Sequence, residues 1–241
     1  MGWFGNVLEW LGDPANWTGA NGILARLYEH VLVSFVALVL CALIALPVAI
    51  WLGHIGRGGG FAINISNVGR AVPTFAIVVL LAVGPLSGQP VIITIVALVL
   101  FGLPPLLTNA YVGMREVDRD VVEAARGMGM RAGQLLRQVE LPLASPLILT
   151  GLRTSAVQIV ATTTIAAIVG GPGLGRIITA GLGNQDQAQL VAGALLVAVL
   201  ALAVEFGMEG VERIGDPVRR ARGSGRGGRP QAVPETVPST P

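Results

Sequence analysis

The 241-residue sequence contains no lysine, one cysteine and two histidines, and only 12% of its residues are charged. A water-soluble domain carries about 25% charged residues, so this chain has too little charge to cover a water-facing surface. The single cysteine, Cys41, cannot form an intrachain disulfide. Together with His30 and His54 it also cannot supply a metal-ligand cluster.

The absence of lysine bears on nucleotide binding as well. Residues 170–187 are as rich in glycine as a phosphate-binding loop, but the pattern GxxxxGK[ST] needs a lysine that this chain does not have. The glycines of residues 56–60 are typical of a turn between two helices. The sequence therefore predicts that this chain has no catalytic site and itself binds no nucleotide, cofactor or metal.

Long apolar runs are what the sequence has in abundance, since 53% of its residues are hydrophobic. A helix that spans a bilayer needs about 20 mainly apolar residues. Five segments meet this requirement: residues 31–52, about 61–83, 91 to about 108, 146–169 and about 187–206. The predicted fold class is an all-α integral membrane protein with five transmembrane helices.

The arginines predict the orientation of these helices, because short cytoplasmic loops are enriched in basic residues. If the loop between the third and fourth spans is cytoplasmic, twelve arginines lie inside and two, Arg26 and Arg176, lie outside. The reverse orientation would give two inside and twelve outside. We therefore expect the N-terminus outside and the C-terminus in the cytoplasm, with no cleaved signal peptide because no basic segment precedes an apolar core.

Three regions follow from this topology. Residues 1–26, with Trp3, Trp10 and Trp17, are predicted to form an extracytoplasmic segment with a short interfacial helix. Residues 27–213 form the transmembrane domain. Residues 214–241, rich in Arg, Gly and Pro, are predicted to be a disordered cytoplasmic tail. Such a tail could contact nucleic acid or anionic lipid, but we favour a solvated tail that sets the topology, with no nucleic-acid partner.

Polar groups inside the spans are candidates for a translocation pathway, because burying them in a membrane is costly. In the second span, Arg70 precedes Pro73 and Thr74, and a proline removes one hydrogen bond from a helix. This pattern is typical of a broken helix that lines a pathway. It is equally typical of an arginine that reaches the interface beside a packing kink.

The fourth span places Thr154, Gln158 and Thr162 on one helix face, at spacings of four residues. That face either lines a pathway or supplies hydrogen bonds between helices, and the size of Gln158 favours the pathway. Arg153 is expected to extend to the cytoplasmic interface. Asn109 and Tyr111 are expected to anchor the third span there.

The interval EAARGMGMRAGQLLRQVELP, residues 123–142, is predicted to be cytoplasmic and helical. Asp120 with Glu123 has the spacing of a helix N-cap, and Val121, Ala124, Ala125 and Met128 give one apolar face. Gly129 is placed to end this helix. A second helix is expected over residues 131–139, and Ser145-Pro146 is expected to open the fourth span. A short amphipathic helix without its own core needs the groove of a partner.

The same residues resemble a motif of a known family. The sequence Glu123-Ala124-Ala125, three residues, Gly129, nine residues and then Val139-x-Leu141-Pro142 resembles the EAA motif of the permease subunits of binding-protein-dependent ABC importers. The resemblance implies that residues 120–130 form a coupling helix that docks on a cytoplasmic ATPase, which binds the ATP and Mg²⁺. The implied coupling residues are Glu123, Ala124, Ala125, Gly129, Leu141 and Pro142.

The stretches GRAVPTFAIVVL, PLLTNAYVGM and GGPGLG look like those of permeases for glycine betaine, choline, carnitine or proline. Methionine-type importers share the same core and remain an alternative. The resemblance further implies a bacterial plasma membrane location, a second permease copy or paralogue, and a separate extracytoplasmic solute-binding (lipo)protein.

Two other classes of function stay open on the residues alone. One is an ATP-independent transporter or channel, which would need buried acids for ion coupling, and the first four spans contain no Asp or Glu. The other is a structural or sensory membrane protein whose cytoplasmic helix binds an unrelated partner.

Overall fold

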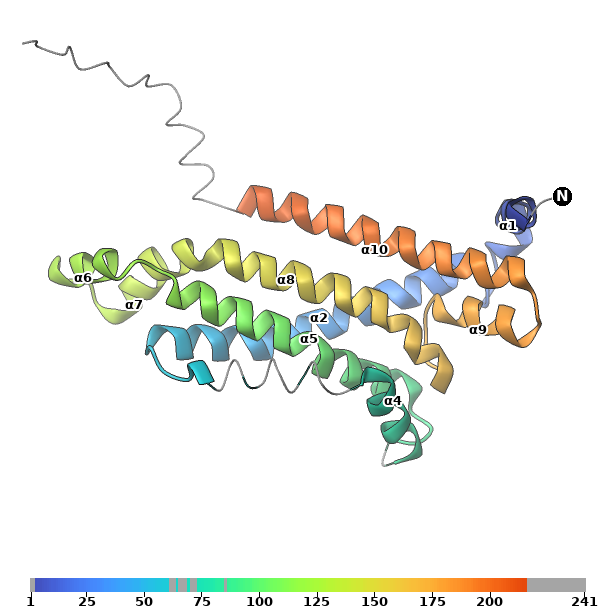
Figure 1. Cartoon of the computed structure of the whole chain (residues 1–241), viewed down its shortest axis with the longest axis horizontal. Coiled ribbons are helices and arrows are strands. Elements are labelled where there is room, and N and C mark those ends of the chain that lie inside the picture. Colours follow the sequence, from blue (N-terminus) through green and yellow to red (C-terminus); the bar gives the residue numbers. More distant parts are fainter. Residues whose placement is uncertain (1–2, 61–63, 65–68, 70–72, 85, 216–241) are drawn as a thin grey trace, which may run out of the picture.

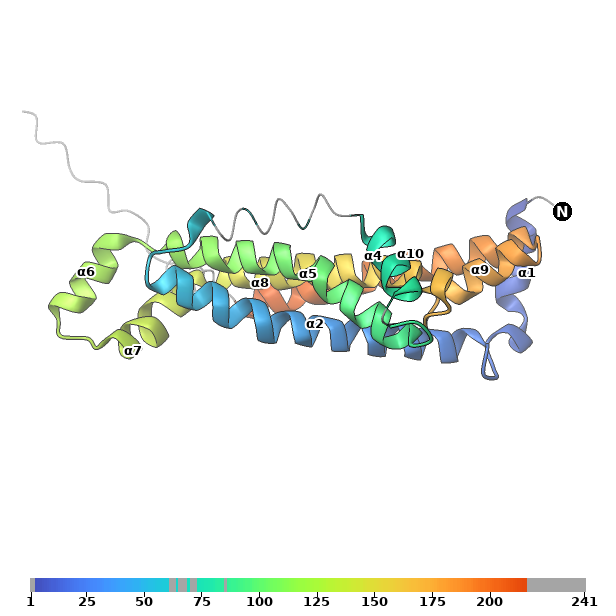
Figure 2. The same ribbon diagram turned by 90° about the horizontal axis from the view of Figure 1, so that it is seen from below.

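The computed structural model describes residues 3–60, 64, 69, 73–84 and 86–215, and these contain helices but no strand. Four long helices run along the same axis (Figure 1): α2 (Ile23–His54), α5 (Pro90–Arg115), α8 (Leu141–Thr163) and α10 (Gln187–Gly215). Short helices lie at both ends of this bundle (Figure 2). The predicted all-helical class is confirmed for the described residues.

At one end of the bundle lie α6 (Arg119–Gly127) and α7 (Ala132–Leu135), and a π-helical turn (Leu136–Glu140) joins α7 to α8 (Figure 1). At the opposite end lie α1 (Trp3–Gly12), a 3-10 turn (Pro14–Asn16) and α9 (Gly175–Gly183). A 3-10 segment (Thr164–Val169) extends α8 towards that end, and α4 (Thr74–Val83) packs beside α5.

By length and composition, four helical segments could cross a membrane: Ile23–His54, Pro90–Arg115, Ala132–Val169 and Gln187–Ile214. They correspond to the first, third, fourth and fifth predicted spans. Of the predicted second span, residues 61–63, 65–68 and 70–72 lie outside the described residues. Its second half forms α4, an apolar helix of 10 residues.

The centre of the bundle is the contact between α2 and α5. Ala37, Cys41, Ala45 and Ala49 recur every fourth residue on α2, and each is fully buried. Small residues on one face let two helices approach closely, which is how helices associate within a membrane. Cys41 lies against the Val99 carbonyl and Gly53 against Met114, so α2 and α5 run in the same direction.

The helix α8 runs antiparallel to α5 and is bonded to both α5 and α2. Ser155 Oγ donates to the Gly102 carbonyl at 2.9 Å, and Ser34 and Thr163 are joined through their hydroxyl oxygens at 3.0 Å. Thr163 uses its only hydroxyl hydrogen on the Ile159 carbonyl, so Ser34 is the donor to Thr163. These two hydrogen bonds come from one face of α8, that of residues 155, 159 and 163.

Gly102 is where α5 touches both of its neighbours. A Cβ at this position would lie 2.7 Å from Ile159 Cδ1 and 3.0 Å from Cys41 Sγ. We therefore expect Gly102→Val to lower the free energy of unfolding by about 1–3 kcal/mol, because overpacking forces neighbouring helices apart. The thermal midpoint of the purified protein measures this effect. A midpoint equal to that of wild type would contradict the packing described.

The end of the bundle with α1 and α9 is held together by polar contacts to the start of α2. Glu29 accepts the Gly173 N–H at 3.0 Å and the Arg26 guanidinium at 2.8 Å. His30 Nδ1 accepts the Leu174 N–H at 3.2 Å, so its Nε2 carries the hydrogen and donates to the Val160 carbonyl at 2.9 Å. These contacts fix the glycine-rich segment against α2.

Several local predictions differ from the structure. The helix α2 starts eight residues before the predicted span, and in this added part Glu29 and His30 find partners on the glycine-rich segment. The helix α9 was not predicted, since its three glycines argue against a helix. The predicted helix in residues 1–26 is confirmed as α1, with Trp17 Nε1 donating to the Leu11 carbonyl at 2.7 Å.

Candidate functional site

The first element of the candidate site is α6, which carries the Glu-Ala-Ala sequence. Its N-cap is Asp118, whose carboxylate accepts the Asp120 N–H at 2.9 Å. The prediction of Asp120 as the N-cap is therefore wrong by two residues. Both aspartates precede the apolar residues of the helix, so the spacing to Glu123 alone selected the wrong one.

The end of α6 is confirmed at Gly129, which has φ of +85°. The Gly129 N–H donates to the Arg126 carbonyl at 2.9 Å, and the Met130 N–H to the Ala125 carbonyl at 3.2 Å. This pair of bonds is a Schellman motif, which needs a left-handed residue just after the helix and therefore favours glycine. The motif sets the direction in which α6 projects from the bundle.

The helix α6 presents apolar residues on two sides. Val122 and Ala125 are 2% and 3% exposed and pack into a cluster with Met114, Leu135 and Ala144. Val121 and Met128 are 43% and 74% exposed, and Ala124 and Glu123 are also exposed. The predicted single face is therefore corrected: Ala125 turns inward with Val122, while Val121, Ala124 and Met128 form a row that no described residue covers.

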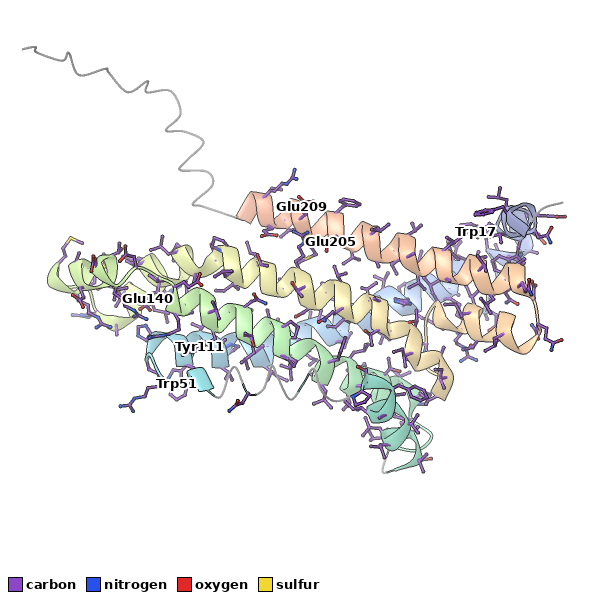
Figure 3. All side chains as sticks on the ribbon, viewed as in Figure 1. Trp17, Trp51, Tyr111, Glu140, Glu205 and Glu209 are labelled. Carbon is purple, nitrogen blue, oxygen red and sulfur yellow. The ribbon has the colours of Figure 1, made fainter. Side chains whose placement is uncertain are left out.

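The turn between α7 and α8 is π-helical. This conformation is rare in proteins, and where it occurs it is frequently at a functional site. Its last residue, Glu140, is 2% exposed and bonds through Oε2 to Nδ1 of His54, at the end of α2. Glu140 lies between the helices at this end (Figure 3). The residues that follow α6 are thereby fixed to α2.

Leu141 and Pro142 begin α8, with Leu141 packed on the cluster under α6. The prediction that Ser145-Pro146 opens this helix is wrong, because Pro146 lies inside it. Pro146 cannot donate an N–H to the Pro142 carbonyl. The Ser145 hydroxyl donates to that carbonyl at 2.8 Å instead, so the helix continues.

The predicted pathway residues of α8 lie on the helix face next to that of Ser155 and Thr163, because each precedes a residue of that face by one position. Thr154 is exposed and donates to the Thr150 carbonyl of its own helix at 2.8 Å. Gln158 and Thr162 are half-buried. Gln158 Oε1 is enclosed and has no hydrogen-bond partner among the described residues. A role of this row in a pathway remains a prediction.

The other predicted pathway residues are Arg70, Pro73 and Thr74, of which the structure describes the last two. Arg70 lies outside the described residues. Pro73 directly precedes α4, and its carbonyl accepts the Ile77 N–H at 3.2 Å. A role of Pro73 in a pathway remains a prediction. Thr74 is the first residue of α4, which packs on α5 and on the 3-10 segment after α8.

Arg153 does not extend freely to the interface as predicted. Its guanidinium bonds to Glu205 and, at 3.1 Å, to Glu212, both on α10, and Thr150 also donates to Glu212 at 2.9 Å. Figure 3 shows Glu205 on the side of α10 that faces α8. Sequence reasoning missed this group and the His54–Glu140 pair. The sequence held one signal for the Arg153 group: Arg153 and Glu205 are charged residues that lie in two different apolar segments.

No group of three or more His, Cys, Asp or Glu side chains among the described residues is arranged to hold a metal ion. The arrangement is that of a helical bundle with one short helix projecting at an end, held by a Schellman motif, a π-helical turn and a buried side-chain pair. Such a surface can transmit a displacement but supplies no reactive group.

Residues 45–214 match the family model described as "Binding-protein-dependent transport system inner membrane component". The chain belongs to this family. It is therefore a membrane component of a binding-protein-dependent transport system. The matched residues include the whole of α5, α6 and α8. Members of this family are permease subunits of ABC transporters, which work with an ATPase and a solute-binding protein.

Curated relatives of this family member cover most of its length. The "Choline transport system permease protein OpuBB" of Bacillus subtilis is 35% identical over 196 residues, which are 81% of this chain and 89% of the relative. The "Carnitine transport permease protein OpuCB" of Listeria monocytogenes is 34% identical over 207 residues, 85% of this chain and 94% of the relative.

Solved structures show the same fold. A chain of the MetNI methionine ABC transporter in an inward-facing conformation superposes with a TM-score of 0.65 at 21% identity, covering 80% of this permease and 95% of that chain. A chain of an amino acid ABC transporter with histidines gives a TM-score of 0.66 at 20% identity, covering 79% and 92%. These structures share the type I importer permease fold with this chain.

Proposed function

We propose that this permease imports a compatible solute (glycine betaine, choline, carnitine or proline), driven by ATP hydrolysis on a separate ATPase subunit. In this proposal ATP and Mg²⁺ bind the ATPase and not this chain. Support for the solute class comes from relatives that are 32–35% identical and are named as choline, carnitine or glycine betaine transport permeases. The observation that carries the coupling is the uncovered apolar row of α6.

The proposed topology has five spans, with the N-terminus outside and the C-terminus in the cytoplasm. Support comes from the direction of α2 and α5: His54 is at the α6 end, whereas α5 begins at the opposite end (Figure 2). The residues between them must therefore return along the bundle. One return crossing added to the four long helices gives an odd number of spans, which is consistent with the arginine distribution.

We assign the role of coupling helix to α6. Val121, Ala124 and Met128 would enter an apolar groove of the ATPase, because an amphipathic helix without its own core is recognised through such a row. Glu123 lies beside this row. Gly129, Leu141 and Pro142 would fix the direction of α6 relative to α8. Closure of two ATPase subunits would then move α6 and rock one permease copy against a second copy or a paralogue.

The pathway is proposed to lie along the row Thr154, Gln158 and Thr162, with Arg70, Pro73 and Thr74 as further candidates. The enclosed, unbonded Oε1 of Gln158 supports this placement, since such an oxygen can accept a hydrogen bond from a passing solute or its water. The chain offers few aromatic side chains, 5% of all residues. A methylated ammonium is best recognised by aromatic rings, so selectivity would reside mainly in the extracytoplasmic binding (lipo)protein.

Methionine-type import is the second candidate, because a methionine ABC transporter has the same fold. Uptake competition separates the two. In a bacterium that lacks its own osmoprotectant importers, uptake of labelled glycine betaine, dependent on this permease with its ATPase and binding protein, is expected to fall when unlabelled choline, carnitine or proline is added. Methionine is expected to have no effect. Inhibition by methionine alone would refute the proposed solute class, and uptake without the ATPase would refute ATP coupling.

A further inference from the structure

The unit that projects from the bundle has opposite charges on its two parts. Residues 116–123 contain four acids (Glu116, Asp118, Asp120 and Glu123) and one arginine, Arg119. Residues 124–139 contain three arginines (Arg126, Arg131 and Arg137) and no acid. The acids of the first part have a local explanation, because negative charge near a helix N-terminus stabilises the helix and Asp118 is its cap.

In the basic part, Arg126 lies in the last turn of α6, where positive charge stabilises a helix, but Arg131 and Arg137 have no such explanation. Arg131 precedes α7, and Arg137 lies in the π-helical turn, so Arg137 is not at the C-terminal end of an α-helix. Both side chains are exposed, and neither has an ion-pair partner among the described residues. The next acid along the chain, Glu140, is buried against His54 and cannot neutralise them from outside.

The two arginines line one open pocket of about 650 Å³, together with Gly133, Gln134 and Gln138. Gln134 Oε1 accepts the Arg131 N–H at 3.0 Å, which leaves the amide NH₂ group of Gln134 as a donor for other bonds. The pocket is thus lined by two guanidinium groups and by amide donors. Guanidinium groups bind carboxylates in a bidentate way.

We infer that this pocket, which we call the arginine pocket (Arg131, Gly133, Gln134, Arg137 and Gln138), binds an acidic rim of the ATPase beside the groove for α6. The inference rests on the proposed coupling role of α6. The arginine pocket is continuous with that surface, because α6 contacts both α7 and the π-helical turn. An apolar row alone allows a short helix to bind in two directions along a groove. An acidic part at one end and a basic part at the other permit only one direction of binding. In the opposite direction, like charges of the helix and the groove would face and repel each other.

The test uses the full chain, co-expressed with the ATPase and binding protein that support uptake. Arg131→Glu with Arg137→Glu reverses the charge of the pocket, and Arg131→Gln with Arg137→Gln removes it without adding acids that could disturb membrane topology. The control is Arg213→Glu, which reverses another exposed arginine, one that is paired with Glu209 on α10. The measurement is the amount of ATPase retained on the detergent-solubilised permease at low and at high salt.

We expect charge reversal to lower ATPase retention at low salt by about fivefold and to abolish its salt dependence, because screening acts only where opposite charges meet. The Gln variant should show a smaller loss, and Arg213→Glu none. The comparison variant Met128→Glu, which tests the coupling role itself, should lose retention at every salt concentration. Acid-to-arginine changes on the ATPase rim should restore binding to the reversed pocket.

Three outcomes would overturn the inference in distinguishable ways. If only Met128→Glu lowers retention, α6 couples as proposed but the arginine pocket does not face the ATPase. If neither the pocket variants nor Met128→Glu change retention, the coupling role fails as well. If retention is unchanged but transport by the pocket variants falls only in vesicles that contain phosphatidylglycerol, the pocket binds anionic lipid headgroups and not the ATPase.

Discussion

His54→Ala is expected to destabilise the permease by about 1–3 kcal/mol, because removing one partner of a buried hydrogen-bonded pair leaves the other without its hydrogen bond. Glu140 is 2% exposed, and its Oε2 bonds to His54 Nδ1. Without that partner, the carboxyl group would remain buried with no hydrogen-bond partner in its place. We expect a lower thermal midpoint for the purified permease and less of it in the membrane.

A double variant separates loss of the pair from loss of volume. His54→Leu with Glu140→Met replaces both polar groups by apolar ones of similar size, which is often neutral or stabilising. Its thermal midpoint should therefore recover to near the wild-type value. The assignment would be contradicted if the double variant were as unstable as His54→Ala, since the effect would then come from packing and not from an uncompensated carboxylate.

Gly129→Val is expected to lower solute uptake by about tenfold or more while the amount of permease in the membrane stays the same. The residue has φ of +85°, where a side chain costs roughly 1–2 kcal/mol and a β-branched one more. A Cβ at Gly129 would meet no atom within 4 Å, so the substitution does not disturb the core. The cost is avoided only if the Schellman motif rearranges, which redirects α6.

The matched control is Gly127→Val, two residues earlier. A Cβ at Gly127 likewise meets nothing within 4 Å, but this glycine does not have a positive φ. Uptake by the control should remain close to that of wild type. Equal uptake by both variants, measured at equal membrane amounts, would show that the direction of α6 does not matter for transport.

Features that depend on local sequence could be predicted. The long apolar runs gave the helices α2, α5 and α10, because 20 apolar residues without charge have few alternatives to a buried or membrane-spanning helix. Gly129 was predicted to end α6, because a left-handed residue is needed after a helix and glycine adopts that conformation at low cost. The helix in residues 1–26 followed from its tryptophans and apolar pattern.

Features that depend on contacts between residues far apart in the sequence could not be predicted. Arg153 with Glu205 and Glu212, and His54 with Glu140, pair residues 52–86 positions apart. Rules based on residue spacing relate residues a few positions apart and cannot pair residues at such separations. The face of α6 was misassigned for a related reason: periodicity finds apolar residues but cannot distinguish Ala125, which packs on its own bundle, from Met128, which does not. The continuation of α8 through Pro146 depended on one hydroxyl, that of Ser145.

The chain has two histidines, and both lie on α2, one near each end. His54 holds the residue that precedes α8, and His30 holds the Val160 carbonyl near the end of α8 and Leu174 beyond it. The two histidines are 24 residues apart, since 54 minus 30 is 24, or about 36 Å along a helix. The length of α2 therefore fixes the distance between the two ends of α8. While these bonds hold, a displacement of the start of α8 along the bundle axis would be carried to the glycine-rich segment at the far end.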